Sequence, residues 1–389
     1  MTDVIDVLMC AGAASWELAI VRGLQPREVG IRVARRCADH GELLGTALRD
    51  RPRAVLLDAS LPWIDRDFVA TLRRAGVEVF AIGSSARPLE RIGARRFTAN
   101  VTADEIAAAL YGLGAPTPSA DLAVMPSPRT GIGRLVVVWS GAGSPGRTMC
   151  AIHLALEAAR SGLRTLLIDA DVWAASIAQT LDLAESPSLA QAALLASEGW
   201  RSPLTDCVQS GPEGLSVLAG LARSELWPEV REESWRAILG TAIAGYEVVV
   251  VDVAAPIEED EELAFDRVPF RRNLVTTLAL ELADHVALVA ATDPVGLRRA
   301  VVAHRTLIER SGATAAELSI VLNRAPRAGR RLQECSRTVS DWMGDAPAAF
   351  LPEEPAFDRV RWEGRSLHDV APRSRWLREL RPLLDGIRI

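Results

Sequence analysis

The sequence contains no lysine, so arginine supplies all 44 of its strongly basic side chains. Such a bias across a whole chain reflects coding composition rather than selection at single sites. An arginine that stands where a motif usually has lysine is therefore, by itself, weak evidence for a changed chemistry.

Cysteine and histidine are also scarce, with five of each. The cysteines contain no C-x-x-C pair and no spacing typical of a metal site or an iron–sulfur cluster. We expect them to be small buried side chains in a reducing compartment. The histidines are equally dispersed and suggest no metal site. The residues are Cys10, Cys37, Cys150, Cys207 and Cys335, and His40, His153, His285, His304 and His368.

Long apolar runs are absent as well, since no eighteen uninterrupted apolar residues occur. The N-terminus lacks a basic segment followed by an apolar one. The sequence therefore predicts neither a membrane-spanning helix nor a signal peptide, and we expect a cytoplasmic protein. A net charge of −6 and a pI near 5.6 disfavour a dedicated nucleic-acid-binding protein.

A chain of 389 residues is too long for one ordinary core, so two domains are expected. Residues 114–132 are rich in Pro, Gly, Ser and Thr and carry no apolar periodicity, which is typical of a linker. The sequence thus predicts a first domain over residues 1–113 and a second over residues 133–389.

The first domain alternates short apolar runs with amphipathic helical patterns. Five such βα repeats predict a small parallel sheet with helices on both faces. The expected strands lie at residues 4–10, 30–36, 53–59, 77–83 and 97–101.

This pattern resembles a response-regulator receiver domain. The segment VLLDASLPWID places Asp58 at the end of the third expected strand, where receivers carry their phosphoacceptor. The acidic pair that receivers use to hold magnesium is replaced by Met9, Cys10 and Ala11. Two interpretations follow: a degenerate receiver fold that serves for docking, which the missing acids favour, or a true phosphoacceptor at Asp58.

The second domain opens with RLVVVWS (134–140), typical of a buried strand, followed by GAGSPGRT (141–148) and a helical pattern. This matches the phosphate loop G-x-x-x-x-G-K-[ST] except for Arg147 in place of the lysine. Glycines let backbone N–H groups turn toward phosphate oxygens, and the helix presents its positive N-terminal end. Arg147 keeps the charge but not the compact shape of an ammonium, and Pro145 removes one N–H donor.

Three carboxylates follow at the ends of expected strands. Asp169 and Asp171 come after RTLLI, and Asp252 ends the four-valine run of GYEVVVVDV, which is the Walker B pattern. A carboxylate at such a strand end holds a magnesium-bound water in P-loop enzymes. The sequence therefore predicts a nucleotide and Mg²⁺ site at this edge of the sheet.

Together these residues resemble the ParA/MinD superfamily of dimeric ATPases over residues 133–386, and the receiver-like first domain resembles its CpaE/TadZ-like branch. The resemblance implies an α/β fold with a mostly parallel sheet, a nucleotide-dependent homodimer and a protein partner in a polar or pilus (Flp/Tad) assembly. It also implies ATP or ADP and Mg²⁺ as ligands. The implied phosphate-loop residues are Gly141, Gly143, Ser144, Gly146, Arg147 and Thr148.

The other implied roles follow the same resemblance. Asp171 and Asp169 would be catalytic, with Thr148, Asp169 and Asp252 around the metal ion. Asn323 would read adenine, and Pro352 would pack on the base. The roles come from the family and not from the spacing of these residues.

Two departures leave hydrolysis open. The family signature has a lysine that crosses the dimer to the partner's phosphate, and alanine occupies that place here, at Ala142. The second departure is Arg147 in place of the loop lysine. One hypothesis is therefore a weak ATPase that organises other proteins in space, and the alternative is a hydrolysis-deficient scaffold acting through docking. A DNA-partitioning role is disfavoured by the acidic balance.

The segment 374–387 mixes arginines with leucines and a tryptophan. We expect an amphipathic helix that packs on the ATPase domain, with peripheral membrane contact as the alternative.

Overall fold

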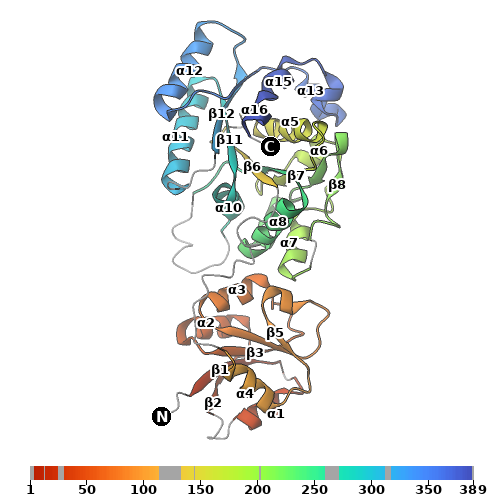
Figure 1. Ribbon diagram of the computed structural model, residues 1–389, viewed down its shortest axis with the longest axis vertical. Coiled ribbons are helices and arrows are strands. Elements are labelled where there is room, and N and C mark those ends of the chain that lie inside the picture. Colours follow the sequence, from red (N-terminus) through yellow and green to blue (C-terminus); the bar gives the residue numbers. More distant parts are fainter. Residues whose placement is uncertain are drawn as a thin grey trace. The chain divides into compact units, whose positions relative to one another are not determined.

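The structure is a computed structural model (Figure 1). It describes residues 4–12, 14–24, 30–113, 133–143, 145–200, 203–258, 271–311 and 317–387, with the backbone alone at Ser311. The chain divides into two compact units. The first is Met1–Pro128 with Leu194–Arg201, and the second is Arg129–Ala193 with Ser202–Ile389. The linker expected at 114–132 lies outside the described residues.

The first unit holds a five-stranded parallel sheet in the order β2-β1-β3-β4-β5. This is the flavodoxin-like order of doubly wound α/β folds. The strands are β1 (Ile5–Cys10), β2 (Ile31–Arg36), β3 (Ala54–Asp58), β4 (Glu78–Ile82) and β5 (Arg95–Phe97). The helices are α1 (Glu17–Leu24), α2 (His40–Asp50), α3 (Arg66–Arg74), α4 (Ala103–Tyr111) and the 3₁₀ turn η1 (Leu89–Ile92).

The two faces of this sheet bury different side chains of the same strands. On β1, Leu8 and Cys10 join the core under α2 and α3, whereas Val7 and Met9 join the core under α1 and α4. Alternation with a period of two places successive side chains on opposite faces. The expected α/β layers are confirmed for this unit.

The fifth strand is shorter and earlier than expected. It covers Arg95–Phe97 rather than residues 97–101, because the backbone turns at Thr98, whose carbonyl accepts the N–H of Val101 at 3.1 Å. Thr102 then caps α4 in a reciprocal capping box with Glu105. The turn at Thr98, and not the extent of the weak apolar run, marks where the strand stops.

Asp58 lies at the carboxyl end of β3, and protein groups already hold its carboxylate. Oδ1 accepts the backbone N–H of Ser60 at 2.8 Å and the Ser60 hydroxyl, and Oδ2 accepts the indole N–H of Trp16 at 3.3 Å. Trp16 is buried. This geometry gives Asp58 a structural role at the start of the loop after β3.

The second unit holds an eight-stranded sheet in the order β13-β12-β11-β6-β10-β7-β9-β8, parallel except for β8 against β9. The strands are β6 (Arg134–Trp139), β7 (Thr165–Ala170), β8 (Gln209–Ser210), β9 (Ser216–Leu218), β10 (Val248–Val253), β11 (His285–Ala291), β12 (Glu317–Ala325) and β13 (Ala349–Pro352). The mostly parallel sheet that the sequence predicted is confirmed.

Helices flank both faces of this sheet (Figure 1). The longer ones are α5 (Arg147–Arg160), α8 (Glu232–Gly245), α10 (Leu274–Leu282), α11 (Pro294–Ser311) and α12 (Arg330–Met343). The helix α7 (Leu189–Ser197) begins in this unit and ends in the first. The shorter ones are α6 (Ile177–Thr180), η2 (Pro212–Gly214), η3 (Ser224–Glu229), α13 (Phe357–Glu363), α14 (Leu367–Val370), α15 (Arg375–Leu380) and α16 (Pro382–Gly386).

The helix α5 is buried on nearly every side. Its residues Cys150–Ala158 are all buried, and they pack with Val136 of β6, Val250 of β10 and Leu167 of β7 in one core. The C-terminal helices cover this core. The strand that leads into the phosphate loop and the helix that leaves it are therefore held rigidly.

The C-terminal segment forms two helices instead of the single helix expected at 374–387. Pro382 begins α16, where its missing N–H breaks no helical bond. Trp376, Leu380 and Leu383 are buried in the core around α5. The apolar face of this segment is thus used inside the unit, in agreement with the expected packing. No helix of the described ranges combines the length and apolarity needed to cross a bilayer.

Replacing Asp58 should reveal its structural role. Asp58→Ala leaves the indole N–H of Trp16 and the Ser60 N–H without their acceptor, so we expect the unfolding free energy to fall by about 1–3 kcal/mol. Asp58→Asn keeps one acceptor oxygen and should lose less. Urea denaturation of the full chain measures both, and equal stability of wild type and Asp58→Ala would contradict this assignment.

Candidate functional site

The loop from Gly141 to Thr148 joins β6 to α5 in the middle of the second unit's sheet, since β6 lies between β10 and β11. Gly143 (φ 110°) and Gly146 (φ 95°) adopt backbone conformations that L side chains rarely take. Ser144, one of the predicted contacts, lies outside the described residues. Among the residues that are described, no side chain caps the first turn of α5. Its N–H groups and dipole therefore face the loop, as an anion site requires.

The helix α11 packs against this loop and comes close to Gly141 and Gly143. A Cβ at Gly141 would lie 3.0 Å from the carbonyl oxygen of Arg299, and one at Gly143 would lie 2.2 Å from its Nη1. The guanidinium of Arg299 thus rests on the glycine loop. The sequence did not predict this residue, because nothing in the local pattern around it indicates proximity to a loop so distant in the chain.

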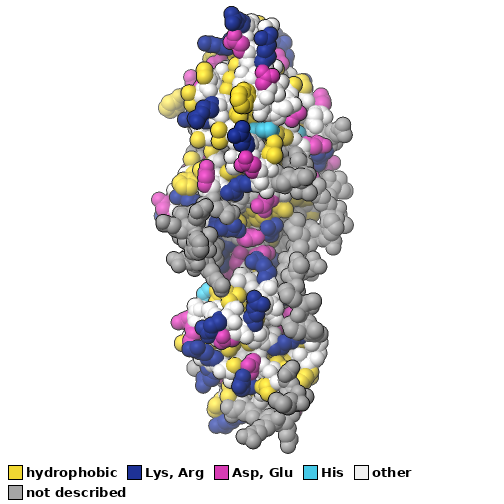
Figure 2. Space-filling model, turned by 90° about the vertical axis from the view of Figure 1, so that its left-hand side faces the viewer, with side chains coloured by type: hydrophobic (Ala, Val, Ile, Leu, Met, Phe, Trp, Pro, Cys, Tyr) yellow, Lys and Arg dark blue, Asp and Glu magenta, His cyan; other side chains and the backbone are white. Residues whose placement is uncertain are grey.

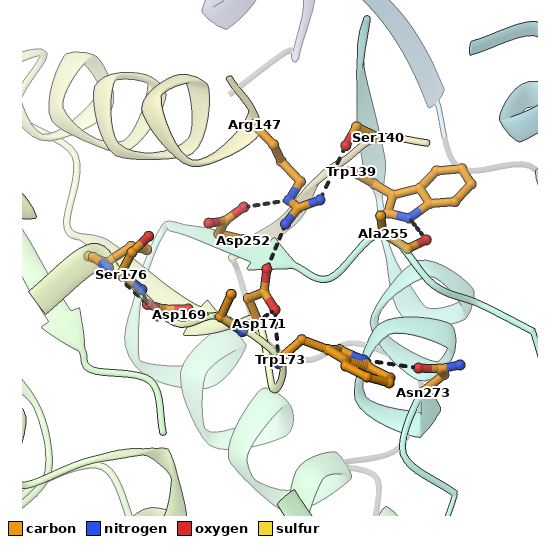
Figure 3. A network of polar contacts seen from close by, with 12 residues as sticks. Trp139, Ser140, Arg147, Asp169, Asp171, Trp173, Ser176, Asp252, Ala255 and Asn273 are labelled. Carbon is orange, nitrogen blue, oxygen red and sulfur yellow. Dashed lines mark hydrogen bonds and ion pairs between the residues drawn. The ribbon is translucent and has the colours of Figure 1, made fainter. Parts of the chain in front are cut away.

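Arg147, at the first position of α5, turns inward and uses all three of its nitrogens (Figure 3). Nε donates to Oδ1 of Asp252 at 3.1 Å, and Nη2 donates to Oδ2 of Asp171 at 2.6 Å. Nη1 donates to the hydroxyl of Ser140 at 3.2 Å. The side chains of Arg147, Asp171 and Asp252 are only 13%, 9% and 1% exposed. A buried network of one cation and two carboxylates therefore occupies the strand ends.

Asp171 accepts hydrogen bonds from Arg147 and from the local backbone. Its Oδ1 accepts the N–H groups of Trp173 and Ala174, both at 3.0 Å, which fixes the turn after β7. Its other oxygen is the one that Arg147 holds. The indole of Trp173 donates to Asn273 at 3.2 Å, and the Arg272 guanidinium lies 3.4 Å from the centre of the Trp173 ring.

Asp169 points away from the loop and caps backbone. Oδ2 accepts the N–H groups of Ser176 and Ile177 at 2.9 Å each, and Oδ1 accepts the N–H of Asp171 at 3.3 Å. Register pairs Asp169 with Asp252 on the neighbouring strand β10. The geometry favours a structural role for Asp169 over the predicted catalytic and metal-binding roles.

Burial shapes the titration of these carboxyl groups. Burial and then the neighbouring charge of Asp252 raise the pKa of Asp169 to about 7. Burial also raises the pKa of Asp252 to about 6, although Arg147 and the Thr148 hydroxyl, which donates to this carboxylate, act to lower it. The pKa values of Asp169 and Asp252 therefore both lie near neutral pH.

Asn323 and Pro352, predicted to contact adenine, lie at the ends of β12 and β13. The Asn323 amide is already used inside the protein: Nδ2 donates to the carbonyl of Pro145 at 2.7 Å, and Oδ1 accepts the indole N–H of Trp376 at 3.1 Å. Pro352 is buried within β13 and pairs with Ala325. A contact of Asn323 with a base therefore requires these bonds to break.

The predicted magnesium ligands do not fit the ion in this arrangement. Mg²⁺ needs near-octahedral oxygen ligands with several waters. Here Arg147 holds Asp252, Thr148 donates to Asp252, and backbone N–H groups hold Asp169. Over the described part of the chain, no group of three or more His, Cys, Asp or Glu side chains is placed to hold a metal ion.

A cavity of about 1170 Å³ lies between α11 and α12. Its lining includes Arg298, Arg324, Arg331 and Trp342, but no residue of the glycine loop.

A glycine loop between a central parallel strand and a buried helix, with carboxylates at the neighbouring strand ends, is the arrangement of the P-loop nucleotide-binding class. Comparison with known proteins shows which members of this class the chain resembles. The antiactivator FleN of Pseudomonas aeruginosa is 25% identical over 248 residues, which cover 62% of this chain and 81% of FleN. No family model matches the chain.

Two solved structures share the fold. The ParA family ATPase of Chlorobium tepidum has a TM-score of 0.54 at 20% identity, and the match covers 66% of this chain and 98% of that one. The septum site-determining protein MinD of Pyrococcus horikoshii, solved with Mg-ADP, has a TM-score of 0.53 at 18% identity, and the match covers 66% of this chain and 96% of that one. The second unit thus has the MinD/ParA ATPase fold.

The raised pKa of Asp169 predicts a pH-dependent stability. The unfolded chain releases this proton near pH 4 and the folded chain near pH 7, so the folded state holds more protons between them. This contribution is complete below about pH 4 and is lost as the pH rises through about 7. Asp169→Asn, which keeps an oxygen for Ser176 and Ile177, should flatten this fall.

Denaturation midpoints measure this effect between pH 4.5 and pH 8, at intervals of about half a pH unit. Asp341→Asn on the exposed surface of α12 is the matched control and should keep the wild-type profile. A fall of unchanged size in Asp169→Asn would show that other groups cause it.

Proposed function

We propose that this protein binds ATP or ADP at the Gly141–Thr148 loop and acts as a nucleotide-dependent organiser of other proteins, in the manner of the MinD/ParA ATPases. The observation that carries the proposal is the N-terminus of the buried helix α5, which no described side chain caps and which follows two glycines of positive φ. The fold of the second unit and the relation to FleN support it. The proposal places the protein in the cytoplasm, where the nucleotide is available.

A protein partner and a nucleotide-dependent homodimer are part of the same proposal. The flavodoxin-like first unit, joined to a MinD-type unit, supports the CpaE/TadZ-like branch and a role in a polar or pilus (Flp/Tad) assembly. FleN is named an antiactivator, which favours action on another protein as the general mode. Asp58, bound to Trp16 and Ser60, supports docking over phosphorylation for the first unit.

Nucleic acid stays disfavoured as a partner. The net charge is −6, and on the face drawn in Figure 2 the arginines and acidic side chains are interspersed rather than gathered by sign. Duplex binding relies on a basic surface that neutralises several phosphates. Membrane contact through residues 374–389 is likewise disfavoured, because Trp376, Leu380 and Leu383 are buried.

The alternative is a hydrolysis-deficient scaffold that holds nucleotide without cleaving it. Two observations favour it over an active ATPase. Ala142 has no cationic group to offer, and Arg147 binds Asp252 and Asp171, the residues predicted to act on magnesium and water. Absence of ATP turnover by the wild type would support this alternative, whereas turnover that is lost in Asp171→Ala would support the ATPase.

Arg299 is the cation that we assign to the phosphates in place of a loop lysine. It approaches the loop from α11, within the same chain, at the backbone of Gly143, which no Cβ shields. The fork of a guanidinium suits two phosphate oxygens. The assignment needs no residue from a second copy of the chain.

Titration with a fluorescent ADP or ATP analogue tests the proposed function, and light scattering with ATP against ADP tests the dimer. We expect Arg299→Gln to weaken binding about tenfold, because it removes a charge-assisted bond to phosphate. The matched control is Arg298→Gln, the adjacent arginine on the cavity side, which should bind as the wild type does. Lack of any nucleotide binding by the wild type would refute the proposed function, and equal effects of the two substitutions would refute the role of Arg299.

A further inference from the structure

The guanidinium of Arg147 lies among the groups that a divalent cation would need. It bonds Asp252 at 3.1 Å and Asp171 at 2.6 Å, and Ser140 at the start of the loop at 3.2 Å. These partners come from β10, from the turn after β7 and from the end of β6. One side chain thus ties together three strand ends that converge below the phosphate loop (Figure 3).

Arg147 cancels one of the two negative charges of this cluster without a metal ion. Two carboxylates face one guanidinium, and an arginine stays charged at every pH at which proteins are folded. Because the Asp252 and Arg147 side chains are only 1% and 13% exposed, water screens their attraction poorly. Displacing the guanidinium would leave both carboxylates buried without a counter-charge, which is strongly unfavourable.

Arginine also keeps donors for a ligand. A guanidinium has five N–H groups, of which the three bonds to Asp252, Asp171 and Ser140 use three. The remaining two N–H groups of Arg147 are donors that suit an anion. The N–H groups at the start of α5 and the Arg299 guanidinium are further donors of this kind. A lysine ammonium is a single point charge and cannot hold two separate carboxylates and a hydroxyl as a planar fork does.

We propose that Arg147 replaces the divalent cation in this protein, so that the site takes a nucleoside di- or triphosphate in its metal-free form. The proposal rests on the proposed nucleotide binding and specifies the chemical form of the ligand. Arg147 neutralises the charge of the two strand-end aspartates, and the phosphates meet donors of the protein rather than a metal ion. The Arg147–Asp252–Asp171 network is then part of the resting and the bound site alike.

The test compares nucleotide binding by the full chain in Mg²⁺ and in EDTA, using fluorescent ADP and ATP analogues. For the wild type we expect dissociation constants that agree within about twofold in the two buffers. Arg147→Lys keeps a positive charge but frees a carboxylate, so its binding should become about tenfold weaker in EDTA than in Mg²⁺. Thermal unfolding without ligand shows whether the variant folds.

A second readout does not depend on nucleotide. Mn²⁺ is a paramagnetic probe for Mg²⁺ sites, and titration followed by electron paramagnetic resonance should show no bound Mn²⁺ on the wild type and one bound ion on Arg147→Lys. If the wild type binds nucleotide about tenfold more weakly in EDTA than in Mg²⁺, Arg147 does not replace the divalent cation, although the proposed nucleotide binding still holds. No binding in either buffer would overturn the proposed function, and this inference with it.

Discussion

The ion pairs of Arg147 with Asp252 and Asp171 are the interaction on which the rest of the site depends. They join the first turn of α5 to the ends of β10 and β7, so moving this turn away from the strands would separate buried charges. Breaking one partner of such a network leaves an uncompensated charge in a medium that solvates it poorly. The first turn of α5 and the ends of the two strands are therefore held together.

The packing of α5 and α11 shapes the surroundings of the loop. Because α5 is buried by the core on its far side, only its N-terminus is free to meet a ligand. The helix α11 packs closely on the loop, and a Cβ at Gly141 would lie 3.0 Å from the carbonyl oxygen of Arg299. Gly143 is required by its positive φ. The same packing brings the Arg299 guanidinium to the loop, beside Gly143.

Aspartates at the carboxyl ends of parallel strands have different roles in this molecule. Asp58 and Asp169 accept local N–H groups and hold the turns that follow their strands, as bonds to Ser60 and to Ser176 show. Asp252 faces Arg147 instead. The carboxyl edge of a parallel sheet gathers these residues, but the neighbouring backbone decides which of them remain available for chemistry.

The sequence by itself determined the two α/β sheets, the position of the glycine loop and the strand ends that carry Asp169, Asp171 and Asp252, because apolar periodicity and glycine spacing are local properties. Only the tertiary structure decided where side chains point. The amide of Asn323 bonds Pro145 and Trp376. Arg299 lies against the glycine loop, and Arg147 bonds the carboxylates at the strand ends. These are contacts between residues far apart in the chain. Such contacts depend on how helices pack on the sheet, which no local pattern records.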